Sequence, residues 1–248
     1  MATHKIFGRK PVLEALAAGV PIKRVYVKAG SQGAAVQELL QRLEEQRIPV
    51  TFLKKFDLDQ MAGGLHHQGV LAVMQKIQPA SLEEVLALTA GEKHPAVVLL
   101  DGIEDPQNFG AILRVAEATG IRAVIYPKRR SAGLSPGTIK ASAGAVFHLT
   151  VAEVTNLARC MDELKEAGFW MVGADMSGDR MPWDVELNMP VGFVMGSEGQ
   201  GLHRLIREKC DFCVRIPMLG KIQSLNVTTA AAMLFYERLR QRQGQSEK

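Results

Sequence analysis

Four side chains in this sequence could together bind and orient a substrate that carries hydroxyl and anionic groups: Asn108, Arg114, Glu198 and Asn226. An amide side chain both donates and accepts hydrogen bonds, an ionised carboxylate accepts them, and a guanidinium donates up to five in a planar fork. Each residue also has an ordinary structural interpretation. Either asparagine could be a helix N-cap, and the arginine could be a solvated surface charge.

These residues lie in three segments that share one pattern, in which an apolar strand is followed by a polar or glycine-rich loop and then by a helix. The segments are 101–110 continuing to Arg114, 193–202, and 215–227. In α/β domains ligands bind beyond the carboxyl ends of the strands. Because three such segments can converge there, a shared functional site explains them better than three unrelated turns do.

The middle segment contains three glycines in six residues, Gly196-Ser197-Glu198-Gly199-Gln200-Gly201, directly after an apolar strand. Glycine allows positive φ angles and a close approach of the backbone to a ligand. A tight turn alone would not explain Glu198, because its small neighbours leave the carboxylate accessible. The chain contains neither the GxGxxG dinucleotide fingerprint nor the P-loop motif. A nucleotide-dependent α/β enzyme of another class therefore has little support.

Composition and cysteine spacing exclude several classes of protein. The 248 residues are 47% hydrophobic and 23% charged, which predicts a packed globular core. No apolar run approaches the roughly 20 residues that span a bilayer, and the first ten residues lack the apolar core of a signal peptide. We therefore expect a cytoplasmic protein with no membrane partner. The CxxC pair Cys210 and Cys213 lacks the further ligands of a zinc site, so we expect no metal and structural thiols, Cys160 included.

Positive charge is concentrated toward the N-terminus. Residues 1–78 contain 11 Lys and Arg against 6 Asp and Glu, a net charge of +5, whereas residues 79–248 contain 19 against 20, a net charge of −1. An excess of this size fits either a polyanionic partner or an ordinary solvated surface. The candidate contacts to a polyanion are Arg9 and Lys10, and Lys128, Arg129 and Arg130 in a later loop.

The apolar pattern divides the chain into two α/β segments joined by a linker. Residues 1–76 form the first, 77–94 the linker, and 95–248 the second. In the first segment we predict helices at 11–18 and 34–46, and strands at 24–27, 48–53 and 70–74. The linker contains a predicted helix at 81–88, because Ser81 and Glu84 match a capping box.

The second segment alternates strands and helices, and its strands are apolar on both faces. This pattern is typical of a mostly parallel sheet covered by helices on both faces. The predicted strands are 97–100, 123–126, 147–151, 170–174, 192–195 and 213–216, and the predicted helices are 109–119, 136–143, 154–167, 202–208 and 227–241.

In order and spacing, the three segments with the polar loops resemble motifs 1, 2 and 3 of the SpoU/TrmH family of RNA 2′-O-ribose methyltransferases. The resemblance extends over all of the second segment. Two stretches of the first, 7–16 and 66–70, are similar to the substrate-binding domain that precedes the catalytic domain in the ribosomal-RNA branch. Within the family, the chain is most similar to the RlmB-type 23S rRNA (guanosine-2′-O-)-methyltransferases.

The resemblance implies a SPOUT-type fold, in which a C-terminal trefoil knot follows a small α/β RNA-binding domain, and a homodimer through the C-terminal domain. It also implies S-adenosyl-L-methionine as the cofactor and large-subunit rRNA as the partner, with methylation of a guanosine ribose 2′-OH in the peptidyl-transferase P-loop. A tRNA or another rRNA nucleotide is the alternative substrate, and a non-catalytic RNA-binding assembly factor is the alternative function.

The resemblance further assigns roles to individual residues. Asn108, Arg114, Glu198 and Asn226 match the active-site residues of the family. The matches to the cofactor-binding residues are Gly196, Ile216 and Leu225, followed by Val194, Met195, Gly201, Met218 and Ser224. Arg114 corresponds to a residue that is often described as the base for the 2′-OH. Since a guanidinium resists deprotonation, Arg114 could instead bind the adjacent phosphate while the proton leaves to water or to Glu198.

Overall fold

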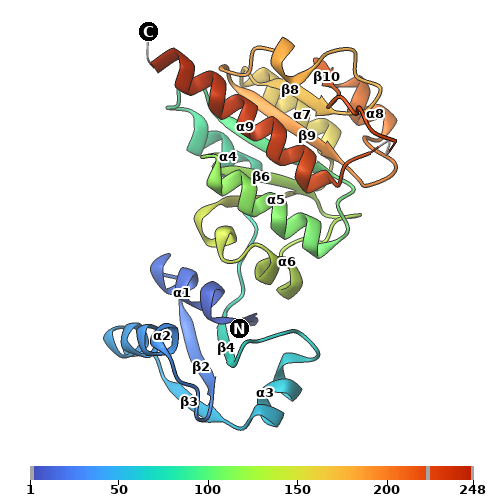
Figure 1. The fold of residues 1–248 in the computed structure, drawn as a ribbon. Helices are drawn as coiled ribbons and strands as arrows, with labels where there is room; N and C mark the ends of the chain where they lie inside the picture. The colour runs from blue at the N-terminus through green and yellow to red at the C-terminus, as the bar shows by residue number, and fades with distance from the viewer. Residues whose placement is uncertain (1–2, 222–223, 247–248) are drawn as a thin grey trace. The chain divides into compact units, whose positions relative to one another are not determined.

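The computed structural model describes residues 3–221 and 224–246. Contacts divide the chain into two compact units, one formed by Met1–Gln78 with Leu134–His148 and the other by Pro79–Gly133 with Leu149–Lys248. Each unit is an α/β structure built on its own sheet (Figure 1). The boundaries predicted from the sequence, 1–76, 77–94 and 95–248, remain a proposal about which parts of the chain fold independently.

The sheet of the first unit has the strand order β1-β4-β2-β3. β4 lies antiparallel between β1 and β2, and β3 pairs in parallel with β2. The elements are β1 (Thr3–Phe7), α1 (Arg9–Ala17), β2 (Ile22–Lys28), α2 (Ala34–Glu45), β3 (Val50–Leu53), α3 (Lys55–Ala62) and β4 (Val70–Gln75). α2 buries Val36, Leu39 and Leu43, whose spacing places them on one helix face. Five of these seven elements were predicted; β1 and α3 were not.

Residues 134–148 also belong to the first unit and contain α6 (Pro136–Ala141) and the 3₁₀ helix η1 (Ala145–His148). The strand predicted at 147–151 is therefore wrong in its first half. Ala143 and Gly144 adopt φ angles of 52° and 102°, which reverse the chain after α6 and start the tight turn. The paired strand begins only at residue 150.

The sheet of the second unit has six strands in the order β10-β8-β9-β5-β6-β7, and every pairing in it is parallel. The strands are β5 (Ala96–Asp101), β6 (Ala123–Pro127), β7 (Thr150–Val154), β8 (Trp170–Ala174), β9 (Val191–Gly196) and β10 (Phe212–Val214). All six residues of β5 and all six of β9 are buried. These two strands form the centre of the sheet, as their uninterrupted apolar sequences predict.

Helices cover both faces of this sheet, as predicted. Val97 and Leu99 of β5 pack into a core that includes α4 (Leu82–Thr89), α7 (Leu157–Glu166) and α8 (Arg204–Glu208). The opposite face is covered by α5 (Pro106–Ala118) and α9 (Val227–Ser246), which pack side by side (Figure 1). There Phe193 of β9 contacts Phe235 of α9, with ring centroids 5.1 Å apart.

The strand order positions a binding site. The chain runs from β5 to β6 on one side and later returns to β9 on the other side of β5. Such a change in direction opens a crevice beyond the carboxyl ends of the two strands. The trefoil knot remains a prediction. Among the residues that the structure describes, no helix is long and apolar enough to cross a membrane.

The three cysteines are free thiols in the second unit. Cys160 is buried in α7, and this burial raises the pKa of its thiol to about 12. Cys210 and Cys213 are half-buried, and burial is also the main reason why the pKa values of their thiols are raised. Since the thiolate is the reactive form, all three are poor nucleophiles at neutral pH.

Candidate functional site

Three of the four candidate catalytic side chains form one hydrogen-bonded cluster. Asn108 Nδ2 donates to Glu198 Oε2 over 3.2 Å. Asn226 Nδ2 donates to Asn108 Oδ1 over 2.8 Å and lies 3.4 Å from the same Glu198 oxygen. Residues separated by as many as 118 positions in the sequence therefore meet at one point. We call this the Asn–Glu–Asn cluster.

Helix capping explains why the two amides are available. Asp105, not Asn108, is the N-cap of α5, because its carboxylate accepts hydrogen bonds from the backbone N–H groups of Gln107 and Asn108. The side chain of Asn108 is therefore free to bind Glu198. Asn226 has both functions, since its Oδ1 accepts from Thr228 N over 2.9 Å while its Nδ2 points to the cluster. The packing of α5 against α9 keeps the two amides together.

Arg114 does not join this cluster. It lies on the exposed side of α5, six residues after Asn108. Within residues 3–221 and 224–246, its guanidinium forms no hydrogen bond or ion pair. Its fork is therefore available to an external group.

The glycine-rich loop after β9 places Glu198 in the cluster. Ser197 and Gly201 exchange two backbone hydrogen bonds, of 3.1 and 3.0 Å, which close a tight turn around Glu198. Gly196 is buried at the start of this turn, where a Cβ atom would overlap the backbone of Gly201 and Leu202. Only glycine fits at position 196, so the close approach of the two ends of the loop explains this residue.

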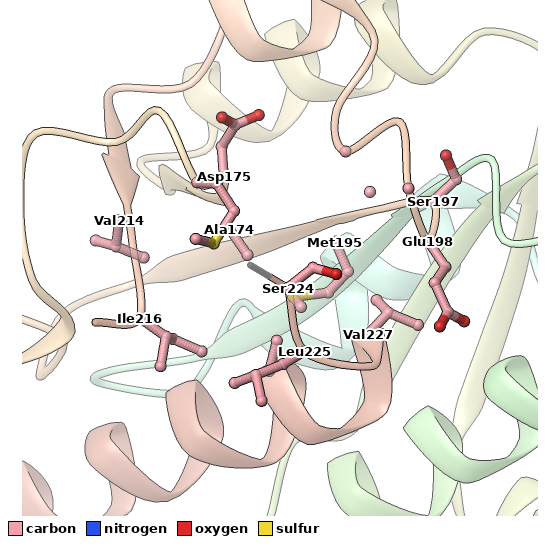
Figure 2. A pocket seen from close by; sticks show the side chains of 15 residues that line it. Ala174, Asp175, Met195, Ser197, Glu198, Val214, Ile216, Ser224, Leu225 and Val227 are labelled. Atoms are coloured by element: carbon pink, nitrogen blue, oxygen red, sulfur yellow. The ribbon is translucent and has the colours of Figure 1, made fainter. Parts of the chain in front are cut away.

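A cavity lies directly beside the cluster, at the carboxyl ends of β8, β9 and β10 (Figure 2). Glu198 belongs both to the cluster and to the wall of this cavity. The rest of the wall is mainly apolar, with a few polar groups. Its lining residues are Ala174, Asp175, Met176, Met195, Gly196, Ser197, Glu198, Gly199, Gly201, Val214, Ile216, Ser224, Leu225, Val227 and Ala230.

Most of the candidate cofactor residues lie in this wall: Met195, Gly196, Gly201, Ile216, Ser224 and Leu225. Val194 is the fourth residue of β9, is fully buried and lies outside the lining residues. Met218 is half-buried in the loop after β10, outside the lining residues. Asp175 and Met176, which also line the cavity, were not predicted from the sequence. The available signal was that Asp175 directly follows the apolar strand 170–174, in the same position as the polar residues of the other segments.

A second cavity is also lined by Ser197 and Glu198. Of the three basic residues predicted in the loop after β6, Arg130 lies in its wall, whereas Lys128 and Arg129 are exposed outside it. The lining residues are Gly102, Glu104, Arg130, Ser197, Glu198, Gln200 and His203. Neither His203 nor the buried carboxylate of Asp101 that binds it was predicted from the sequence to be a site residue.

The first unit contains a separate basic cavity. Arg9, predicted to contact a polyanion, lines it together with Lys28 and Lys55, which were not predicted from the sequence. His67 and Asp59 also line this cavity, and the buried ring of His67 is hydrogen-bonded to Asp59 over 2.8 Å. Lys10 is exposed and lies outside the lining residues. We call this the N-terminal basic cavity.

The part of the chain that the structure describes contains no group of three or more His, Cys, Asp or Glu side chains that could hold a metal ion. The Asn–Glu–Asn cluster offers hydrogen-bond donors and acceptors, and the cavity beside it offers a mainly apolar wall. Such a site can hold a small molecule in the cavity and present one of its atoms to a hydroxyl beside Glu198.

Comparisons with known proteins identify the two halves of the chain. Residues 95–236 match the model of the SpoU rRNA Methylase family, and residues 5–80 match the model of the RNA 2′-O ribose methyltransferase substrate binding domain. A protein of Staphylococcus haemolyticus (strain JCSC1435), assigned to the TrmH family of tRNA/rRNA methyltransferases, is 41% identical over 96% of this chain and 95% of its own length.

Solved structures agree with these matches. The SpoU methyltransferase AviRb from Streptomyces viridochromogenes, in complex with the cofactor AdoMet, has a TM-score of 0.81 at 25% identity, over 97% of this chain and 90% of its own. The A. aeolicus TrmH/SpoU tRNA modifying enzyme has a TM-score of 0.56 at 29% identity, over 66% of this chain and 86% of its own. The chain belongs to the SpoU/TrmH family of RNA methyltransferases and carries the substrate-binding domain of the 2′-O-ribose enzymes.

Proposed function

We propose that this protein transfers the methyl group of S-adenosyl-L-methionine to the ribose 2′-OH of a guanosine in large-subunit rRNA, in the peptidyl-transferase P-loop. One observation carries the proposal: Glu198 is shared by the Asn–Glu–Asn cluster and by the wall of an apolar cavity. A hydroxyl bound by the cluster would therefore lie next to whatever the cavity holds.

The cavity fits S-adenosyl-L-methionine by the chemistry of its wall. Ile216, Leu225 and Val227 offer an apolar surface for an adenine ring, and Ser224 and Asp175 offer polar groups for ribose hydroxyls or an amino group. Gly196 keeps one side of the wall free of side-chain atoms. AviRb, a structural neighbour over nearly the whole chain, was crystallised with this cofactor.

When bound, the cofactor supplies an electrophilic methyl carbon on a sulfonium. The contribution of this chain is positioning, which can account for most of the rate enhancement of a reaction between two bound groups. The ribose 2′-oxygen would accept this methyl group, and its hydroxyl proton must leave. Asn108 and Asn226 orient the ribose and Glu198, whose carboxylate or a water molecule accepts the proton.

Arg114 has a different role in this proposal. Its guanidinium binds the phosphate next to the reactive ribose and stabilises negative charge that develops on the 2′-oxygen.

We also propose that the protein is a homodimer through its C-terminal domain and that its C-terminal segment forms the trefoil knot of the family. The exposed position of Arg114 would then allow it to act on RNA at the site of the partner.

The choice of rRNA depends on the N-terminal unit. Its substrate-binding match and its basic cavity support a second contact to a large RNA, since three cationic side chains converge there. The A. aeolicus tRNA modifying enzyme matches only 66% of this chain. A tRNA substrate is the second candidate, because the S. haemolyticus relative is assigned to a family that modifies tRNA or rRNA.

The proposal is tested by methyl transfer from labelled S-adenosyl-L-methionine to total RNA of a strain that lacks this protein, followed by mapping of the product. A single 2′-O-methylguanosine in the large-subunit P-loop is expected. Label on tRNA, or elsewhere in rRNA, would retain the chemistry and reject the target. Cofactor binding without any label on naked RNA or ribosomal precursors would indicate a non-catalytic RNA-binding factor.

A further inference from the structure

His203 connects a buried carboxylate to an exposed arginine beside the proposed reaction site. Asp101, only 6% exposed at the end of β5, accepts hydrogen bonds from His203 N over 2.8 Å and from the ring Nδ1 over 3.0 Å. The other ring nitrogen, Nε2, lies 3.3 Å from Arg130 Nη1. Asp101 ends β5, whereas Arg130 lies in the loop after β6 and His203 in the loop after β9, and all three belong to the second unit.

The direction of these hydrogen bonds follows from their chemistry. A carboxylate can only accept, so the Nδ1 of His203 must carry the proton that binds Asp101. In the neutral ring the Nε2 then has a lone pair, and it accepts a hydrogen bond from the guanidinium of Arg130. The chain of donors thus runs from Arg130 to His203 and from His203 to Asp101.

The backbone around both partners is arranged to hold this contact. Arg130 has a φ angle of 57°, an uncommon conformation for a residue other than glycine. Its loop is tied to the loop after β5, because Ala132 N donates to Ile103 O over 2.9 Å. A Cβ atom on Gly102 would lie 3.3 Å from Cε1 of His203, so the ring lies tightly against a position that has no side chain.

The cavity that Arg130 lines also contains the carboxylates of Glu104 and Glu198. A flexible arginine there would pair with one of these carboxylates and would lose its affinity for other anions. The hydrogen bond to His203 gives Arg130 a fixed alternative partner. The remaining donors of the guanidinium are then available to a tetrahedral oxyanion, for which the planar fork of arginine is well suited.

We propose that Asp101 and His203 are positioning residues that hold the guanidinium of Arg130 in place to bind one phosphodiester of the RNA beside the reactive ribose. This inference rests on the proposed function. It identifies which of the three loop cations makes a defined contact. Lys128 and Arg129 contribute only general attraction, because they are exposed outside the cavity.

The test is a double-mutant cycle on RNA binding and on methyl transfer, made with the full chain. His203→Asn removes Nε2 but leaves the hydrogen bond from the backbone at 203 to Asp101, so the fold is retained. We expect His203→Asn and Arg130→Ala each to raise the RNA Kd and KM by about tenfold, as for loss of a charge-assisted hydrogen bond. The kcat and the Kd of S-adenosyl-L-methionine should change little. The double variant should be no weaker than Arg130→Ala alone.

Arg129→Ala provides the matched control, because Arg129 is the neighbouring cation and has no hydrogen bond to the described residues. Its effect on RNA binding should add to that of His203→Asn. In salt titrations, Arg130→Ala should reduce the slope of log Kd by about 0.7, the value for one phosphate contact on a single strand, and His203→Asn should reduce it too.

Additive effects of His203→Asn and Arg130→Ala on the RNA Kd would overturn the inference, as would a loss of kcat at unchanged KM. The binding readout separates this result from the proposed function. If His203→Asn and Arg130→Ala show the expected coupling in RNA binding but the wild-type protein transfers no methyl group, the proposed reaction is rejected and the positioning of Arg130 by His203 is retained. A protein that transfers the methyl group, but in which the effects of His203→Asn and Arg130→Ala on RNA binding are additive, would retain the proposed reaction and reject the inference about His203.

Discussion

Asn226 and Asn108 are joined by a hydrogen bond of 2.8 Å, with Asn226 Nδ2 as donor and Asn108 Oδ1 as acceptor. This bond fixes the orientation of both amides. Since Asn108 Oδ1 is occupied, its Nδ2 must point to Glu198, as observed. One amide thereby determines which atoms of the other are presented to a substrate.

The first prediction separates this orienting function from helix capping. Asn226→Asp retains a good N-cap acceptor for Thr228 N but loses the amide donor and places a second carboxylate beside Glu198. We expect kcat to fall by about 100-fold, as when a reacting group is misplaced by about 1 Å, with the melting temperature unchanged. Asn108→Ala should lower kcat to a similar extent. Normal turnover in Asn108→Ala, measured in single-turnover assays, would remove that residue from the reaction.

The second prediction concerns Gly196. Because a Cβ atom there would overlap the backbone at 201 and 202, Gly196→Ala should displace the glycine-rich loop and destabilise the protein by about 1–3 kcal/mol, as overpacking does. Calorimetric titration should show a large loss of affinity for S-adenosyl-L-methionine. Gly91→Ala is the control, since nothing lies within 4 Å of a Cβ atom at that position. Unchanged cofactor affinity in Gly196→Ala would contradict our assignment of the cavity.

The third prediction follows from the position of Arg114 outside the Asn–Glu–Asn cluster. If the proposed homodimer places it at the site of the partner, Asn108→Ala and Arg114→Ala protomers should each be inactive alone. When the two are unfolded together and refolded as mixed dimers, activity should return in part. No recovery, with mixed dimers confirmed by mass spectrometry, would show that both residues act within one protomer. Arg114→Lys should stay impaired, because an ammonium lacks the planar fork.

The fourth prediction is that His4 makes the free energy of unfolding depend on pH. Burial of this side chain, together with the nearby charge of Lys76, lowers the pKa of His4 in the folded protein. The unfolded chain has the ordinary value of about 6.5, so below that pH it binds a proton that the folded protein does not. The free energy of unfolding should therefore fall as the pH decreases from about 6.5 toward the folded pKa.

Denaturant unfolding between pH 7.5 and 5 checks this dependence. His4→Gln should flatten the curve, whereas His66→Gln, which replaces an exposed histidine in the same unit, serves as the control for loss of a histidine. An unchanged curve in His4→Gln would assign the effect to other groups.

The sequence allowed the central sheet to be predicted because β5 and β9 are buried on both faces and read as continuous apolar runs. β1 was missed because it lies at the edge of its sheet and its first three residues are exposed or half-buried, so the apolar signal is short. The strand predicted at 147–151 began too early because Phe147 is apolar, whereas the positive φ angles at 143 and 144 decide the local structure and the strand begins only at residue 150.

The residues of the functional site could also be predicted only in part. Asn108, Glu198 and Asn226 were identified because each follows a strand that ends at the same edge of the sheet. His203 gave no such signal, since a single histidine before a short helix is usually structural. Its significance depends on Asp101 and Arg130, which lie 102 and 73 residues away in the sequence. Pairings of this kind are visible only in three dimensions.

The first unit uses two separated pieces of the chain, and this has a consequence for synthesis on the ribosome. Residues 134–148, which contact β1 through α6, are translated after β5 and β6 of the second unit. The first unit, whose four strands are already complete, therefore gains its last helices when the second sheet has only two of its six strands. A nascent chain whose residues up to 148 have just left the ribosomal exit tunnel contains a complete first unit and an unfinished second one. Stalled nascent chains of that length are thus the place to look for the order in which the two units fold.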